Sequence, residues 1–369
     1  MSGSSSSSSS DPDSPRATRV TAVKTSETPP STSAPDFQPS PTFAPTSETP
    51  PPSSASSSSV ARSSIQSLSS ILSSVPSSLA SSPNPSFSLL HDPIISSQIS
   101  SLLRHPDSGS GDHNLCRWLY DTFHSTDPQL QLVVLRFLPI IAGVYLTRVS
   151  RRKSLAGFEA ILLALYAHET TARRGQPVTV HVPDLSHSSI YHEAKPSTKT
   201  NATELNLAVI SSSLEPHGTM RSTKRARIVG VALELYYSKI SQLPVTSKIE
   251  FCEFCEIWAG QEISNHGDDN NGSNAANKEK RKGRIPLAWE LLQPTLRIIG
   301  HCLLGPHRNK ELYDAASSAT KSLYARSLHD IDAKAILATS SLLRLQKMAS
   351  DPKNNVGYTE IPKVNVITL

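Results

Sequence analysis

The sequence predicts an all-α protein: an irregular bundle of stacked antiparallel helical hairpins with at most one or two short strands, preceded by a disordered Ser/Pro-rich tail. Three observations support this class. Of the first 100 residues about 36 are Ser and 15 are Pro, so this stretch has too little apolar surface to offset chain entropy. The later sequence spaces its apolar residues at helical intervals. The alternation of apolar and polar residues that is typical of strands occurs only in short stretches.

Composition divides the chain of 369 residues into a tail and one domain. Residues 1–59 are expected to be the disordered tail. Residues 60–350 are expected to form a single helical domain, which contains all three Trp and all four Cys. Within it, residues 60–111 are expected to be a weakly ordered leading segment, and 260–284 a disordered polar loop. Residues 351–369 are expected to be an irregular C-terminal tail.

The first elements are short and rich in serine. A weak helical stripe of apolar residues runs over 60–79, but serine is a poor residue for a helix interior. A short helix is expected over 94–103. Asp112 is a candidate N-cap for an amphipathic helix over 115–123.

A more apolar group of helices follows. Asp127 and Pro128 are typical of a helix start and open a long apolar helix over 130–145, which Pro139 should kink. A third helix is expected over 158–166, ended near Gly175. The short connections between these helices favour antiparallel packing.

The remaining elements include the only strand signals. Residues 178–182 alternate Val with polar residues and predict one extended edge strand, and a second short strand is expected near 207–210. Helices are then predicted over 224–240, over 246–258 with Thr246 as a candidate cap, and over 289–303, 312–323 and 331–345. Small residues on the last two helices favour close pairing.

Charge and targeting signals exclude several classes. The formal net charge is +5, from 36 Lys and Arg against 31 Asp and Glu, which is too small an excess for a dedicated nucleic-acid binder. The start lacks an apolar signal core, Ser2 excludes myristoylation, and the apolar run over 130–146 is interrupted by Arg136 and Pro139. An intracellular protein is expected; a plastid transit peptide is the less favoured alternative for the Ser-rich start.

Two side-chain groups could in principle bind metal. Cys252 and Cys255 have the spacing of half a zinc site, but no second pair follows, so small core residues on a helix are the favoured interpretation. His181, His187, His192 and Glu193 lie in an irregular segment, and thirteen His make a chance cluster probable in a chain of this length. No metal or other cofactor is therefore predicted.

The chain also lacks signatures of catalysis. It has no Gly-x-Ser-x-Gly elbow and no phosphate-binding glycine motif, so no catalytic residues are predicted. Two basic runs remain, at 148–153 and 278–284. The first lies where a helix end and a connector are expected. The second is interpreted as a solvated loop, with contact to an acidic lipid or partner and nuclear import as alternatives. The residues that could make such a contact are Arg151, Arg152, Lys280, Arg281 and Lys282.

Several stretches of the sequence resemble the hyccin family, in its plant-type form. The resemblance covers about residues 60–348 and is strongest between 112 and 195. It is carried by Phe137-Leu138-Pro139, Val144-Tyr145-Leu146, Arg151-Arg152, the run from Glu159 to Tyr166, Val182-Pro183-Asp184-Leu185-Ser186, Ser189-Ile190-Tyr191-His192-Glu193, the segment from Ile249 to Cys255, and Ile285-Pro286.

This resemblance implies an all-helical, non-catalytic subunit of the plasma-membrane phosphatidylinositol 4-kinase alpha complex. Such a subunit would bind a tetratricopeptide-repeat scaffold, promote production of phosphatidylinositol 4-phosphate, and lie in the cytosol and peripherally at the plasma membrane. The candidate contacts to the scaffold are large apolar residues of the first helices: Trp118, Phe123, Phe137 and Tyr145.

Two rival functions stay open at this point. A nucleic-acid or acidic-partner adaptor would need basic residues gathered on one folded face. A hydrolase that used the segment from His181 to Glu193 would need a pocket with a nucleophile within reach.

Overall fold

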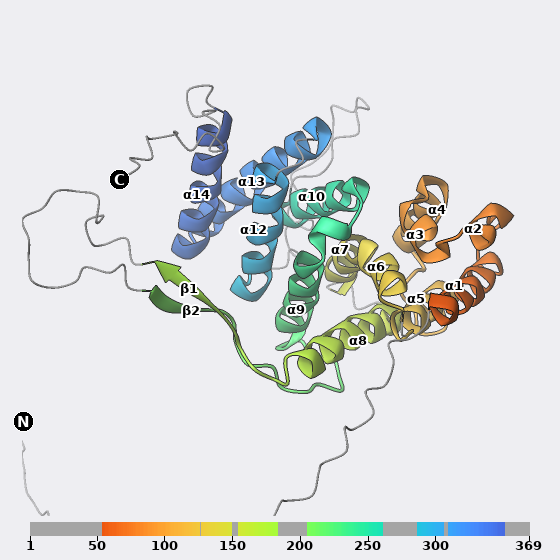
Figure 1. The fold of residues 1–369 in the computed structure, drawn as a ribbon. Helices are drawn as coiled ribbons and strands as arrows, with labels where there is room; N and C mark the ends of the chain where they lie inside the picture. The colour runs from red at the N-terminus through yellow and green to blue at the C-terminus, as the bar shows by residue number, and fades with distance from the viewer. Residues whose placement is uncertain are drawn as a thin grey trace, which may run out of the picture. The chain divides into compact units, whose positions relative to one another are not determined.

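The structure is a computed structural model and describes residues 54–125, 127–149, 154–183, 205–260, 286–305 and 309–350. These residues form helices and one two-stranded ribbon (Figure 1), which confirms the predicted all-α class. The predicted disordered tail lies outside the described residues as far as residue 53. The predicted loop after Gly260 and the predicted tail over 351–369 lie outside them as well.

Four helices form the N-terminal part of the described chain. They are α1 (Ser54–Ser69), α2 (Ser77–Ser81), α3 (Pro85–His91) and α4 (Pro93–Arg104). The helix α1 begins six residues before the domain boundary expected at residue 60, and the stripe expected over 60–79 is divided between α1 and α2. Ile65, Leu68 and Leu79 are buried. Tertiary packing thus stabilises a serine-rich helix that has low intrinsic propensity.

The next three helices are α5 (Asn114–Phe123), α6 (Pro128–Arg136) and α7 (Leu138–Val149). Asp127 caps α6 as predicted, since its Oδ1 accepts a hydrogen bond from the Gln129 amide at 2.9 Å. The prediction of Asp112 as the cap of α5 is wrong, because the N-cap position is His113. The single helix expected over 130–145 is two helices bent by 43°. Pro139 has no amide hydrogen and its ring clashes with the preceding turn, so the helix breaks at Phe137.

The segment that follows contains the ribbon. The helix α8 (Ala156–Ala172) leads into β1 (Val178–Pro183), and β2 (Leu205–Ser211) leads into α9 (Arg225–Ser238). The strands pair antiparallel, with Val180 opposite Ala208, which confirms both predicted strands. The ribbon projects from the helices (Figure 1).

The C-terminal helices stack on one another. A single 3-10 turn (Ile240–Gln242) precedes α10 (Val245–Ala259), and α12 (Trp289–Leu304), α13 (Lys310–Asp330) and α14 (Ala333–Ser350) follow. The prediction of Thr246 as a cap is wrong, because the N-cap of α10 is Pro244 and no side chain caps the helix. α13 packs against α10, α12 and α14. Ala316 and Ala319 on α13 are fully buried, so the predicted close pairing through small residues is confirmed.

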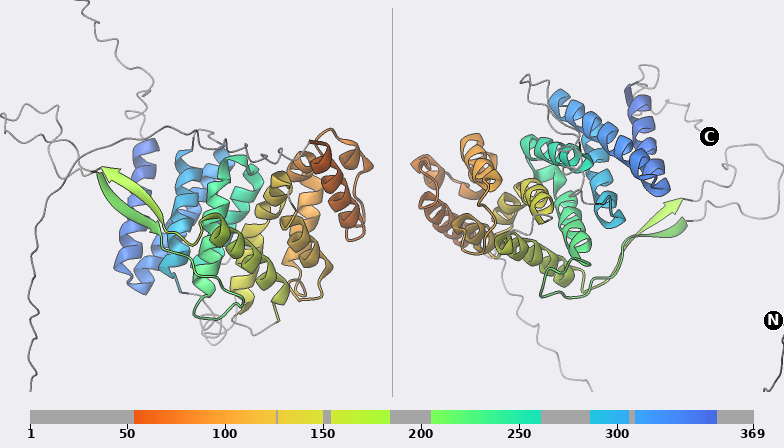
Figure 2. Two further views of the ribbon diagram at one scale, coloured as in Figure 1. Left: turned by 60° about the horizontal axis from the view of Figure 1, so that its bottom comes forward. Right: turned by 180° about the vertical axis from the view of Figure 1, so that it is seen from behind.

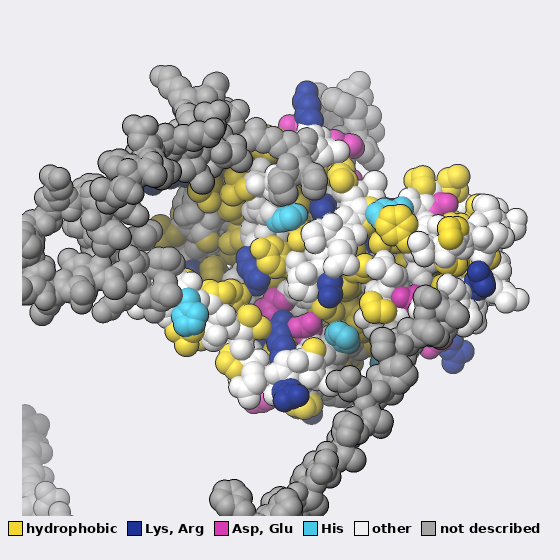
Figure 3. Space-filling view, in the orientation of Figure 1, with side chains coloured by type: hydrophobic (Ala, Val, Ile, Leu, Met, Phe, Trp, Pro, Cys, Tyr) yellow, Lys and Arg dark blue, Asp and Glu magenta, His cyan; other side chains and the backbone are white. Residues whose placement is uncertain are grey.

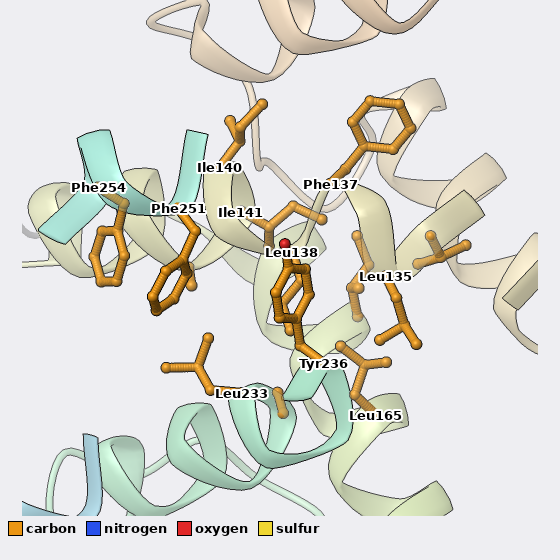
Figure 4. Close-up of a cluster of buried hydrophobic side chains, with 14 of the residues drawn as sticks. Leu135, Phe137, Leu138, Ile140, Ile141, Leu165, Leu233, Tyr236, Phe251 and Phe254 are labelled. Carbon is orange, nitrogen blue, oxygen red and sulfur yellow. The ribbon is translucent and has the colours of Figure 1, made fainter. Parts of the chain in front are cut away.

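The core lies where α6, α7, α8, α9 and α10 meet. Figure 4 shows side chains from these helices pointing toward one another, among them Leu138, Ile141, Leu233 and Phe251. Two further views show the helices of this region side by side (Figure 2). Within the described ranges no single helix is long and apolar enough to span a membrane. The bent pair of α6 and α7 together has the length and apolar composition, but its apolar side chains are largely buried in the protein.

Candidate partner-binding surface

The four large residues expected to contact a scaffold all lie inside the protein. Trp118 is buried and its Nε1 donates a hydrogen bond to the Ser64 carbonyl at 2.9 Å, which ties α5 to α1. Phe123 is buried with its ring edge-on to His168. Phe137 is buried at the bend between α6 and α7. These positions give the aromatic side chains a packing role within the chain.

Tyr145 is fully buried and links three helices. Its hydroxyl donates to Glu159 Oε1 at 3.1 Å and accepts from Arg225 Nε at 3.0 Å. Burial raises the pKa of Tyr145 to about 12. The phenol therefore stays protonated at neutral pH and acts as a hydrogen-bonded connector between α7, α8 and α9.

A buried arginine holds the centre of the molecule together. The Arg136 guanidinium donates to the Leu90 carbonyl and to Thr246 Oγ1, and the Arg136 carbonyl accepts from Ser247 Oγ at 2.6 Å. Burial lowers the pKa of Arg136 below its ordinary value, but the group stays charged at neutral pH because an arginine titrates so high. This network joins α3, α6 and α10, so Arg136 has a structural role.

The cysteine pair lies in the core, as favoured from the sequence. Cys252 and Cys255 on α10 and Cys302 on α12 are free and buried. The hydrogen bond between the Cys252 and Cys302 thiols raises the pKa of Cys252 and lowers that of Cys302, and burial raises the pKa of Cys255. In the part of the chain that the structure describes, no three His, Cys, Asp or Glu side chains gather as metal ligands would.

The other candidate residues are spread over the chain. His181 lies exposed on β1, whereas His187, His192 and Glu193 are outside the described residues. The five basic candidates Arg151, Arg152, Lys280, Arg281 and Lys282 are outside them too. On the face seen in Figure 3, Lys and Arg side chains are distributed over several helices and do not form one basic patch. That face therefore lacks the concentrated charge that the nucleic-acid alternative requires.

Large apolar side chains are exposed on the last helix instead. On α14, Ala335 and Thr339 are buried on the inner side, where the helix packs on α12 and α13. At 100° per residue, Leu337 and Met348 lie on the opposite side, and Leu345 lies at its edge. Leu337 is 69% exposed, Met348 54% and Leu345 45%. We call Leu337, Ser341 and Leu345 the α14 face.

The turn before α14 adds an unusual feature to this surface. Ile331, the C-cap of α13, has φ of 54° and is 84% exposed. The left-handed conformation costs a residue with a Cβ about 1–2 kcal/mol, and glycine is the usual residue there. The chain thus keeps an exposed, β-branched side chain in a strained conformation in the turn that leads into α14. The prediction that Ile331 begins the last helix is wrong for the same reason.

Charge on this helix has a single sign. α14 carries Lys334, Arg344 and Lys347 and no acidic residue. Lys334 Nζ lies 3.7 Å from the centre of the Trp289 ring, whereas Arg344 and Lys347 are exposed beside the α14 face. An apolar strip with a basic border fits a partner whose own apolar surface has an acidic border.

This surface is not among the site residues predicted from the sequence. One feature of the sequence does point to it: apolar residues lie on both sides of the helix over 333–350. A helix that is apolar on all sides is usually covered on all sides. In the described structure only one side is covered. The outer side is therefore the candidate contact surface.

The described fold defines a class of protein: an all-helical chain, apart from one ribbon, whose last helix leaves apolar side chains exposed. The sequence comparison agrees with that class, since the hyccin family model matches residues 80–366. The chain belongs to the hyccin family, whose members are non-catalytic and have an adaptor-type role in the phosphatidylinositol 4-kinase complex. The match starts later than the resemblance expected from residue 60 and continues beyond residue 348.

Proposed function

We propose that this protein is an adaptor subunit of a plasma-membrane phosphatidylinositol 4-kinase complex. It binds a tetratricopeptide-repeat scaffold subunit, and through it the kinase alpha subunit, and thereby promotes production of phosphatidylinositol 4-phosphate. The observation that carries this proposal is the α14 face in a chain of the hyccin family. The protein would lie in the cytosol and, within the complex, peripherally at the plasma membrane.

The mechanism is the burial of an exposed helix face. In stacked helical hairpins each helix covers its neighbour, and an end helix normally has a polar outer side. A hairpin of the scaffold would complete the stack by covering Leu337 and Leu345, which are now in water. Burial of apolar area contributes about 25 cal/mol per Å², and any partner that binds only the folded state stabilises it. The isolated protein should therefore be less soluble and less stable than the complex.

The role is tested by purifying the tagged full chain from cells and identifying the proteins that accompany it. We expect the scaffold and the kinase to co-purify, and we expect depletion of the chain to lower phosphatidylinositol 4-phosphate at the plasma membrane. A variant that neutralises Lys280, Arg281 and Lys282 should retain the scaffold. Recovery of neither scaffold nor kinase with the wild-type chain would contradict the adaptor role.

A further inference from the structure

Three of the four cysteines of the chain lie close to one another in the core. Cys252 and Cys255 belong to α10, and Cys302 belongs to α12, which packs against α10. All three are free thiols. The sequence spacing pairs Cys252 with Cys255, whereas the fold places Cys252 against Cys302. The packing of two helices thus creates a dithiol that the spacing of the cysteines does not reveal.

The contact between Cys252 and Cys302 is a direct one. Their thiols share a hydrogen bond. Two sulfur atoms at hydrogen-bonding distance have to approach by only about 2 Å to reach the length of a disulfide bond. Cys255, one turn further along α10, interacts with Cys302 electrostatically, without such a hydrogen bond among the described residues. Cys252 is therefore the thiol that can reach Cys302.

The two thiols of this pair differ in access and in acidity. Cys302 is 7% exposed, whereas Cys252 is 0% exposed, so a small oxidant that arrives from water meets Cys302 first. The hydrogen bond from the Cys252 thiol lowers the pKa of Cys302 and raises that of Cys252. The thiolate is the nucleophilic form of a cysteine. Cys302 is thus the more reactive thiol, and Cys252 is placed to resolve the product.

A buried lysine adds to this difference. Lys248 lies one turn before Cys252 on the same side of α10 and is 8% exposed. Burial lowers the pKa of Lys248, and the neighbouring Cys302 opposes that change. In return, Lys248 lowers the pKa of Cys302 further. Among the described residues no carboxylate forms an ion pair with Lys248, so its charge is available to stabilise a thiolate at Cys302.

We propose that Cys302 and Cys252 form a redox-active dithiol, which a hydroperoxide converts into a disulfide between α12 and α10. The Cys302 thiolate attacks one oxygen of the peroxide, so that an S–O bond forms, the O–O bond breaks, and the leaving oxygen takes up the proton lost by Cys302. The Cys252 thiol then attacks the resulting sulfenic acid. The S–S bond forms, the S–O bond breaks, and the hydroxyl group leaves as water with the Cys252 proton. Two thiols are oxidised for each hydroperoxide that is reduced.

The disulfide would lie beneath the last two helices. α13 packs on α10 and α12, and α14 packs on α12 and α13. A covalent bond between α10 and α12 therefore fixes the layer that supports the α14 face. The reaction itself needs no partner chain, so it is independent of the proposed adaptor role.

Peptide mapping of the isolated full chain tests the proposal. The folded chain is treated with hydrogen peroxide, its remaining thiols are alkylated, and peptides are analysed by mass spectrometry without reduction. We expect a disulfide between Cys252 and Cys302 in the wild-type chain and in Cys255→Ser, and none in Cys302→Ser. Cys255→Ser is the matched control, because it removes a neighbouring buried thiol outside the pair. Circular dichroism checks that each variant keeps the helical fold.

The rate of disulfide formation tests the role of the lysine. Lys248→Met keeps an unbranched buried side chain but removes its charge. We expect the disulfide to form at least about threefold more slowly, because a rise of about one unit in the pKa of Cys302 lowers its thiolate fraction more than it raises the nucleophilicity of the thiolate. An unchanged rate would contradict the assigned role of Lys248.

Three further results would overturn the proposal. A disulfide between Cys255 and Cys302 in the wild-type chain would show that Cys252 is not the resolving thiol. Oxidation of Cys302 to a sulfinic acid, or recovery of both thiols unchanged, would show that the two sulfurs do not couple. A disulfide that forms only in urea would show that the folded core keeps them apart.

Discussion

The helices α5 to α7 and the hairpin of α13 and α14 differ in where their large apolar side chains lie. In α5 to α7 the large side chains Trp118, Phe137 and Tyr145 are buried. In the last hairpin both Ala319 and Leu323 on α13 are buried, whereas Leu337 on α14 is exposed. The first region satisfies its own packing, whereas α14 leaves Leu337 and Leu345 exposed.

This difference shows why residue size alone does not identify an interface. A large aromatic side chain on an amphipathic helix is as suitable for a core as for a partner, and here the core contains all four predicted contacts. Exposed apolar groups on a helix whose other side is already packed have no such internal role. This comparison supports α14 as the proposed partner surface.

The largest effect on stability is expected in the first region. Phe137→Ala removes a fully enclosed ring at the bend between α6 and α7 and should lower the free energy of unfolding by about 3–5 kcal/mol. Urea denaturation followed by circular dichroism measures this change. A loss below about 1 kcal/mol would show that Phe137 is not a core residue.

A smaller loss is expected from the buried arginine. Arg136→Met leaves the Leu90 carbonyl and Thr246 without their donor, at about 1–3 kcal/mol for each group that finds no other partner. Arg136→Lys should not restore the wild-type midpoint, because one ammonium cannot reproduce the planar guanidinium that reaches both acceptors. Full recovery of the midpoint with lysine would contradict the assigned network.

In the second region a substitution should raise stability. Ile331→Gly relieves the left-handed strain and removes no buried contact, so the isolated chain should gain about 0.5–1 kcal/mol. The same variant should bind the scaffold more weakly, because the exposed isoleucine is lost. Thermal unfolding and scaffold affinity are measured on the same sample. A variant that is less stable and binds as well as wild type would reverse both expectations.

Much of the fold follows from periodicity, and the departures from it have physical causes. The long apolar helices and both strands lie where spacing predicts them, and Asp127 caps α6 through a local contact that sequence reveals. The caps at Asp112 and Thr246 were not predictable, since each depends on the angle at which the chain enters the helix. Thr246 instead accepts from Arg136, a residue 110 positions away.

The candidate site was the least predictable part. Helical spacing shows that residues 333–350 are apolar on more than one side, but it does not show which side packs against α13. The left-handed conformation of Ile331 contradicts the local preference of isoleucine, so no propensity argument could find it. Both features depend on how the last hairpin is placed against the stack, which is long-range information.

The central claim, that the α14 face binds the scaffold, is tested most directly by affinity. The double variant Leu337→Asp with Leu345→Asp is compared with Ile94→Asp, which changes an exposed apolar residue on α4, and with the wild-type chain. All three should have free energies of unfolding within about 0.5 kcal/mol of one another, because exposed positions contribute little to folding. Isothermal titration against the purified scaffold should show at least about a hundredfold weaker binding for the double variant only, as expected when apolar anchors of about 2 kcal/mol or more are lost. Equal affinity of the double variant and the wild-type chain would contradict the claim.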